Sequence, residues 1–167
     1  MTEREEVRFT TLVKQVNLDG KLEQMRAFIQ HGSVTTYDHV ISVAKMSFRM
    51  NLFFKAGADE AALVRGALLH DYYLYDWHTW KGPLHGPYHP KAALKQAKSD
   101  FPDLNAREAN IIRSHMWPLT LFHYPKTREA VIVCIADKIV STQETLFRRG
   151  KKQIKKEQTL AETGKTD

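Results

Sequence analysis

The sequence has very little cysteine: Cys134 is the single one among 167 residues. An intrachain disulfide is therefore impossible, which excludes the small disulfide-rich proteins of oxidising compartments. The N-terminus, Met1 to Glu6, is mostly charged and precedes no apolar segment, so no signal peptide is predicted. The longest aliphatic run, Val131 to Ala136, is far too short to cross a bilayer. We therefore expect a cytoplasmic protein with no membrane partner.

Acidic residues are scarce towards the C-terminus. The formal net charge is +6, and residues 148–167 contain seven Lys or Arg against three Asp or Glu, so four of the net positive charges lie there. No aromatic side chains alternate with these charges, which disfavours a nucleic-acid partner. We expect residues 148–167 to be a basic, flexible tail and residues 1–147 to be a single domain, with 1–31 as an N-terminal helical extension.

Segments in which polar and apolar residues alternate are also missing, although residues 131–135 alone would suit a buried strand. Apolar residues recur at helical spacing instead, which predicts an all-α bundle of about six helices. Thr35 with Asp38 and Asn105 with Glu108 have the spacing of capping boxes. The expected helices cover about 9–30 (broken near 19–20 and closed at 31–32), 35–55, 59–71, 90–99, 105–115 and the segment from 127 onwards.

Six aromatic residues fall within the seventeen positions from 72 to 88, together with two Gly-Pro pairs. The pattern predicts a long loop rather than a helix. A loop of this kind can act as a lid or as the wall of a pocket. The alternative is a segment that only covers core surface with aromatic rings, and the sequence leaves both open.

Three side chains in apolar surroundings are able to bind a metal. His70 and Asp71 end the helix expected over 59–71, and Asp137 interrupts the most apolar helix of the chain. A buried carboxylate is costly unless it is paired or bound to a cation. The alternatives are a solvent-exposed Asp71 beside an ordinary core histidine, and an ion pair between Asp137 and Lys138. Imidazole and carboxylate ligands together favour Fe, Mn, Zn or Ni over calcium.

The order His39, His70-Asp71, Asp137 resembles the H, HD, D signature of the HD-domain metal-dependent phosphohydrolase superfamily. His89, followed by Pro90, and His115 resemble the further ligands of its two-metal branch. The fragments Leu-His-Gly-Pro at 84–87 and Ile-Ala-Asp-Lys-Ile at 135–139 are similar to small bacterial HD proteins of the dinucleoside-tetraphosphate hydrolase-like kind.

The resemblance implies an HD-type helical bundle with its core over residues 35–147. It also implies one or two divalent transition metal ions. One ion would be held by His39, His70, Asp71 and Asp137, and Asp71 would bridge to a second ion completed by His89 and His115. His85 competes with His89 for the role of loop ligand. His70 and Asp71 would be the catalytic pair, acting through a metal-activated hydroxide.

The sequence departs from the family at the residues after Asp71. Many members have a lysine there that lies near the substrate phosphate, whereas this chain continues with Tyr72-Tyr73. Residues that could neutralise phosphate charge are Lys81, His78 and Lys138, and rings that could stack on a base are Tyr73, Trp77 and Trp80. The expected substrate is a nucleotide or another small phosphate ester or anhydride.

Two alternatives of other classes stay open. The first is a non-catalytic HD-type regulator that senses a ligand and uses the basic tail as its contact surface. The second is a di-iron oxygenase on the same bundle. Met46, Met50, Phe53 and Phe54 have helical spacing that suits either the core or the face of a homodimer. His123 is expected to be a loop residue rather than a metal ligand.

Overall fold

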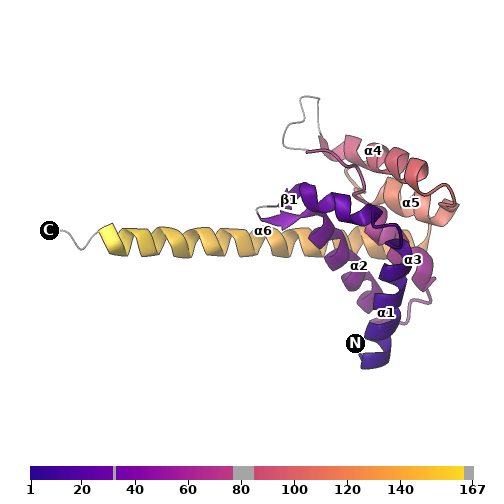
Figure 1. Cartoon of the computed structure of the whole chain (residues 1–167), viewed down its shortest axis with the longest axis horizontal. Coiled ribbons are helices and arrows are strands. Elements are labelled where there is room, and N and C mark those ends of the chain that lie inside the picture. Colours follow the sequence, from indigo (N-terminus) through magenta and orange to yellow (C-terminus); the bar gives the residue numbers. More distant parts are fainter. Residues whose placement is uncertain (32, 77–84, 164–167) are drawn as a thin grey trace.

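The structure is a computed structural model that describes the backbone of residues 1–31, 33–76 and 85–163 and the side chains of residues 1–30, 33–76 and 86–146. Its architecture is all-α, as predicted, with one small two-stranded sheet (Figure 1). In chain order the elements are α1 (Glu3–Val16), the 3₁₀ helix η1 (Lys21–Ala27), β1 (Ile29–His31), β2 (Val34–Thr35), α2 (Thr36–Phe53), α3 (Glu60–Leu69), α4 (His85–Asp100), α5 (Ala106–Ser114) and α6 (Arg128–Thr163).

Four helices form the centre of the bundle. Helix α2 packs against α3 and α6, and α5 packs against the same two helices. Their apolar faces bury Phe48, Leu63, Leu68, Ile111 and Val133 completely. Each such side chain contributes about 1.5–3 kcal/mol when it leaves water. This packing places the C-terminal ends of α3 and α5 beside α2 and α6, where the candidate metal ligands lie.

Gly66 allows α3 to lie close to α5. A Cβ atom at position 66 would come within 3.0 Å of the Cβ of Ile111 and 3.1 Å of its Cγ2. Any side chain at this position would therefore push Ile111 and the two helices apart. Because α3 ends beside His70 and α5 ends beside His115, the spacing between these helices also sets the distance between two candidate ligands.

Three of the predicted helix starts are confirmed. The Thr35 hydroxyl accepts a hydrogen bond from the backbone N–H of Asp38 at the start of α2. Asn105 and Glu108 form a complete capping box at the start of α5. Asp59 caps α3 by accepting hydrogen bonds from two backbone N–H groups. Each cap satisfies donors that have no partner within the helix, which fixes where the helix begins.

The prediction of one helix from residue 9 to 30 is wrong in its second half. Helix α1 starts earlier, at Glu3, and a left-handed Gly20 (φ +64°) follows its end. The chain then forms η1 and the strand β1, which pairs antiparallel with β2. His31 thus lies in a strand and does not close a helix. The extended backbone allows the side chain of Gln30 to reach the candidate site, a contact that apolar periodicity cannot reveal.

Helix α4 starts at His85, five residues before the expected start at Pro90. Pro87 fits the first turn because the backbone N–H groups there have no intrahelical partner. Pro90 lacks the N–H that would bond the carbonyl of Gly86, and the helix continues despite this loss. The loop prediction therefore holds for residues 72–76 and is wrong for 85–88, and residues 77–84 lie outside the described part of the chain.

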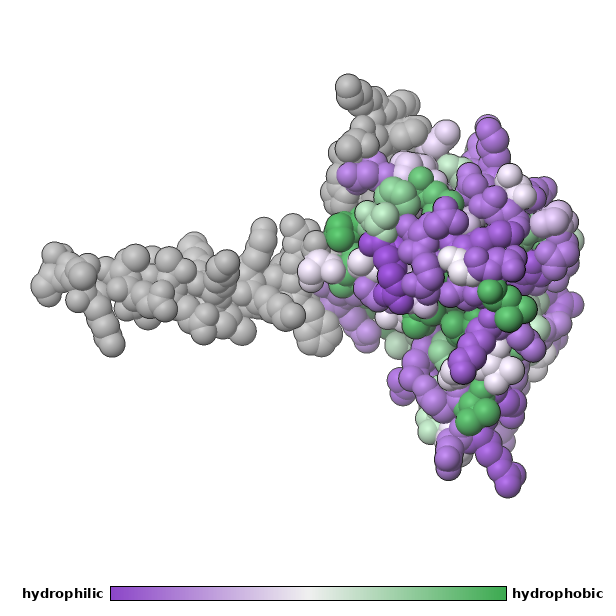
Figure 2. Space-filling view, in the orientation of Figure 1, coloured by the Kyte–Doolittle hydropathy of each residue, from purple (hydrophilic) through white to green (hydrophobic). Residues whose placement is uncertain are grey.

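Helix α6 is much longer than the other helices and extends away from the bundle (Figure 1). Residues 148–163, expected to be a tail, continue it as helix. The division into a domain over 1–147 and a tail from 148 stays a prediction. The face of the molecule in Figure 2 is mostly hydrophilic, with small groups of hydrophobic residues between. No helix in the described ranges combines the length and the apolar character needed to span a bilayer.

Candidate metal centre

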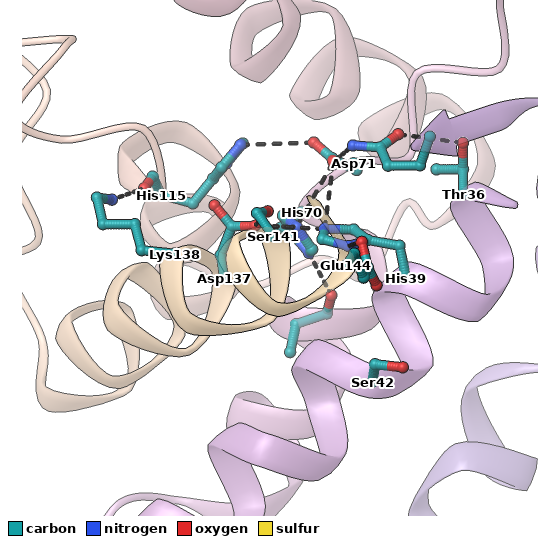
Figure 3. Close-up of polar contacts among 12 residues, drawn as sticks. Thr36, His39, Ser42, His70, Asp71, His115, Asp137, Lys138, Ser141 and Glu144 are labelled. Atoms are coloured by element: carbon teal, nitrogen blue, oxygen red, sulfur yellow. Dashed lines mark hydrogen bonds and ion pairs between the residues drawn. The ribbon is translucent and has the colours of Figure 1, made fainter. Parts of the chain in front are cut away.

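The six predicted ligands come from five helices or helix ends and meet in one buried cluster (Figure 3 shows His39, His70, Asp71, His115 and Asp137). His39 is in the first turn of α2, and His70 and His115 cap the C-termini of α3 and α5. All of them are at most 7% exposed, so the cluster is shielded from bulk water. The ligands are His39, His70, Asp71, His89, His115 and Asp137.

His70 and His115 have the same local geometry. The Nδ1–H of His70 donates to the backbone carbonyl of Ala67 (2.6 Å), and that of His115 donates to the carbonyl of Ile112 (2.9 Å). Each bond fixes the tautomer and leaves the lone pair of Nε2 directed into the cluster. The Nε2 of His70 is buried and has no hydrogen-bond partner among the described residues. An imidazole nitrogen in this situation is suited to bind a cation.

Asp71 lies between two groups of histidines. Its Oδ1 is 3.2 Å from the Nε2 of His89 and 3.5 Å from the Nε2 of His115. Its Oδ2 is 3.6 Å from the Nε2 of His70 and 3.8 Å from the Nε2 of His39. One carboxylate thus presents a different oxygen to each group, which is the arrangement that a bridging ligand requires.

Asp137 completes the group on one side of Asp71. Its Oδ1 lies 3.3 Å from the Nε2 of His39 and 3.8 Å from the Nε2 of His70. The Ser141 hydroxyl, one turn further along α6, donates to the same oxygen (3.2 Å). The alternative partner Lys138 bonds elsewhere: its ammonium group donates to the backbone carbonyls of His115 and Cys134 (both 3.1 Å).

The charges of the cluster are strongly coupled. Burial opposes the ionisation of Asp71, but the surrounding His70 and His89 outweigh it and hold the pKa of Asp71 far below its usual value. Burial also opposes the protonation of His39, yet its bonds to carboxylates raise the pKa of His39 to about 10. Burial, helped by nearby His70, lowers the pKa of His115 to about 3. Without a metal, protons on some histidines balance the buried carboxylates.

The donor set fits divalent transition metals. Two ligands that are each about 2.1 Å from one ion lie about 3.0–3.4 Å apart at tetrahedral or octahedral angles. The contacts of Asp137 with His39 (3.3 Å) and of Asp71 with His89 (3.2 Å) lie in this range. The Nε2 atoms of His89 and His115 are only 2.8 Å apart, a separation that requires a proton or a cation between them.

Potential ligand atoms come within 4.8 Å of one another in two overlapping groups that share His70. One group adds His39 and Asp137 to His70, and the other adds Asp71 and His115. His89 contacts the second group through Asp71, which supports it as the loop ligand; the side chain of the alternative, His85, lies outside the described residues. That these residues bind metal stays a prediction.

The structure describes only some of the residues that are predicted to bind substrate. Lys81, Trp77, His78 and Trp80 lie outside the described residues. Tyr73 is only 5% exposed, and its hydroxyl donates to the side-chain carbonyl of Gln30 (2.6 Å). Its ring lies 5.8 Å from that of His89 and so borders the cluster. The ammonium group of Lys138 is held by backbone carbonyls. A role in substrate binding stays a prediction for all of them.

Sequence reasoning missed three polar residues around the ligands. Gln30 donates to the Oδ2 of Asp71 (2.6 Å), Ser141 donates to Asp137, and Glu144 accepts from the Nδ1–H of His39 (3.0 Å). Ser141 and Glu144 follow Asp137 at i+4 and i+7, so one face of α6 carries all three. That spacing was readable in the sequence, whereas the contact of Gln30 depends on the hairpin.

Comparison with known proteins agrees with the geometry. The model of the HD domain family matches residues 36–141, well over half of the chain and the span that holds all six candidate ligands. A search of curated proteins and a search of solved structures gave no match. HD domains bind divalent metals and are generally metal-dependent phosphohydrolases. From the family match and the ordered ligand set, we conclude that this chain belongs to the HD-domain family.

Proposed function

We propose that this protein hydrolyses a phosphate ester or anhydride bond in a nucleotide or another small phosphate compound, with bound divalent metal. The observation that carries this proposal is the position of Asp71, which turns one carboxylate oxygen towards His89 and His115 and the other towards His39 and His70. Family membership supports the phosphohydrolase class.

The residues of the cluster fall into two potential binding positions that share Asp71. When bound, divalent cations lower the pKa of coordinated water towards neutrality and offset the negative charge of phosphate oxygens. We assign His39, His70, Asp71 and Asp137 to one position, and Asp71, His89 and His115 to the other.

The protein itself supplies fixed ligands. The low pKa of Asp71, which neighbouring histidines maintain against the effect of burial, keeps its carboxylate ionised at neutral pH. Gln30 fixes one oxygen of Asp71, and Ser141 fixes one oxygen of Asp137. Ligands held in this way need little reorganisation when substrate arrives, which favours catalysis in a buried site.

Support for a nucleotide comes from the sequence between residues 72 and 88. Trp77 and Trp80 could stack on a base, and His78 and Lys81 could contact phosphate, in place of the lysine that follows the His-Asp pair in many HD proteins. We therefore propose this segment as the substrate-binding element. The expected stacking contribution is about 1–3 kcal/mol for each ring.

The test is a hydrolysis assay with defined metals. Purified protein is stripped with a chelator, reloaded separately with Mn²⁺, Fe²⁺, Zn²⁺ or Ni²⁺, and offered nucleoside mono-, di- and triphosphates, dinucleoside polyphosphates and a generic aryl phosphate. Asp71→Asn should abolish metal-dependent release of product. Asp19→Asn, at a side chain that is 75% exposed, is the matched control and should retain it.

Each result separates the proposal from its alternatives. Metal-dependent hydrolysis that is lost in Asp71→Asn supports a phosphohydrolase. Metal-loaded protein that leaves every phosphate compound intact contradicts it. In that case, nucleotide binding that survives Asp71→Asn would indicate a ligand-sensing regulator, and oxygen consumption with iron but not manganese would indicate an oxygenase.

A further inference from the structure

We propose that Glu144 is a positioning residue for His39: its partly buried carboxylate fixes the imidazole so that Nε2 faces the metal site. The inference rests on the proposed metal centre, and it adds a residue that lies beyond the segment matched by the family model, which ends at residue 141. Glu144 and His39 are separated by 105 positions in the sequence and meet where α6 crosses the start of α2 (Figure 3).

The contact has the geometry of a charge-assisted hydrogen bond. The Oε2 of Glu144 is 3.0 Å from the Nδ1 of His39, whose side chain is fully buried, and the Glu144 side chain is only 12% exposed. The two ring nitrogens of an imidazole face away from each other. A carboxylate at Nδ1 therefore lies on the opposite side of the ring from Asp71 and Asp137, so Glu144 acts through His39 and is not itself one of the ligands.

Helix α6 sets the distance between this contact and the ligands. Asp137, Ser141 and Glu144 occupy positions i, i+4 and i+7 and so lie along one face of the helix. Asp137 and Glu144 contact opposite nitrogens of the same ring, at 3.3 Å and 3.0 Å. A rigid helix thus holds His39 at both ends, and a rotation of its imidazole would break one of the two contacts.

His39 differs in this respect from the two histidines that cap helices. The Nδ1 atoms of His70 and His115 donate to neutral backbone carbonyls, which belong to the helices themselves. The Nδ1 of His39 faces a carboxylate instead, and an anionic partner makes the opposite nitrogen a stronger donor to a cation. Loss of such a partner typically weakens metal binding by about 10–100-fold.

The experiment compares metal binding by the full-length protein and its Glu144→Gln, Glu144→Ala and Glu3→Gln variants. Titration of Co²⁺ into chelator-treated protein gives a dissociation constant from calorimetry, and the visible absorption of bound Co²⁺ reports its ligand geometry. We expect about 10–100-fold weaker binding and a changed spectrum for Glu144→Ala. Glu144→Gln retains an acceptor oxygen without the charge and should show a smaller loss. Glu3→Gln, on the exposed start of α1, should match the parent.

The outcomes separate the role of Glu144 from the proposed function. Glu144→Ala with parental affinity and an unchanged Co²⁺ spectrum overturns the positioning role. A structural role alone would lower the melting temperature of the metal-free variant and leave the spectrum unchanged, which also overturns it. Should Glu144→Ala fail to fold, the nearly isosteric Glu144→Gln supplies the same comparison. A parent that binds Co²⁺ as expected but hydrolyses nothing removes the proposed reaction and leaves the role of Glu144 standing. A parent that binds no metal removes both.

Discussion

The side-chain amide of Gln30 donates a hydrogen bond of 2.6 Å to the Oδ2 of Asp71, although the two residues are 41 positions apart. The side-chain carbonyl of Gln30 accepts from the Tyr73 hydroxyl and from that of Thr36. Gln30 lies in β1, before the segment that the family model matches. The short hairpin therefore completes the surroundings of the candidate bridging carboxylate.

Replacement of Gln30 should destabilise the metal-free protein. Gln30→Ala removes a hydrogen bond from a buried carboxylate, which costs about 1–3 kcal/mol. The loss should be smaller with Mn²⁺, because a cation then neutralises Asp71. Urea denaturation with and without Mn²⁺ measures both values. Gln15→Ala, on the exposed side of α1, is the control. An equal loss with and without metal would contradict the link to Asp71.

Gly66→Ala should destabilise the fold despite the higher helix propensity of alanine. The added methyl group would clash with the Cδ1 of Ile111, which valine lacks, and would also lie 3.0 Å from its Cβ, which has little freedom to move. Overpacking of this kind costs about 1–3 kcal/mol, and the gain in helix propensity offsets about 1 kcal/mol of that. Thermal unfolding of the metal-free variant measures the net change in stability that results from these two effects. The double variant Gly66→Ala with Ile111→Val should recover part of the lost stability. A melting temperature equal to or above that of the parent would show that α3 and α5 tolerate separation.

Metal binding should strengthen as the pH rises from about 6 to about 8. Carboxylate partners raise the pKa of His39 to about 10 against the effect of burial, so at neutral pH both ring nitrogens of His39 are protonated. A metal that binds Nε2 must displace the proton there. The pKa of Asp71 is lowered, so this carboxylate is already ionised and adds no dependence in this range. For each proton that the metal displaces, the dissociation constant falls about tenfold when the pH rises by one unit.

Calorimetry in buffers of different ionisation enthalpy counts the protons released when metal binds. His39 determines the direction of the pH dependence. Its proton competes with the metal at low pH, so the dissociation constant should fall as the pH increases. A dissociation constant that is the same at both ends of this pH range, with no proton release, would contradict a metal position at His39.

Chelation should lower the melting temperature, since metal binds only the folded arrangement of these ligands. At one hundred times the dissociation constant, bound metal stabilises by about 2.7 kcal/mol. For a chain of this length that corresponds to roughly 5–10 °C. His115→Ala should lose much of this shift. His123→Ala should keep it, because the Nε2 of His123 bonds Arg113 instead of the cluster.

The helices were largely predictable because their starts depend on local chemistry. Thr35, Asp59 and Asn105 each satisfy backbone donors within their own first turn, so a few neighbouring residues determine the boundary. The segment that includes Gln30 was not predictable in this way. It is extended and pairs with β2, which lets the Gln30 side chain bond a residue 41 positions away, and no periodicity in the sequence records that contact.

The ligands were predictable as a set, while the contacts of their supporting residues were not. An ordered series of histidines and aspartates resembles a family signature, and His70 and Asp137 also stand out as polar residues in apolar helices. Glu144 follows Asp137 at i+7 on the same face of α6, but its contact with His39 exists only because α2 packs against α6. Contacts of this kind arise from tertiary packing, which the sequence of either helix alone does not determine.

His70 and His115 cap the C-termini of α3 and α5, so both helices end at the same cluster. The carbonyl end of a helix carries a partial negative charge equivalent to about half an elementary charge. The two helix ends thus add to the negative potential of the ionised Asp71 and Asp137, so the fold itself favours positive charge inside the cluster, as histidine protons or as a cation.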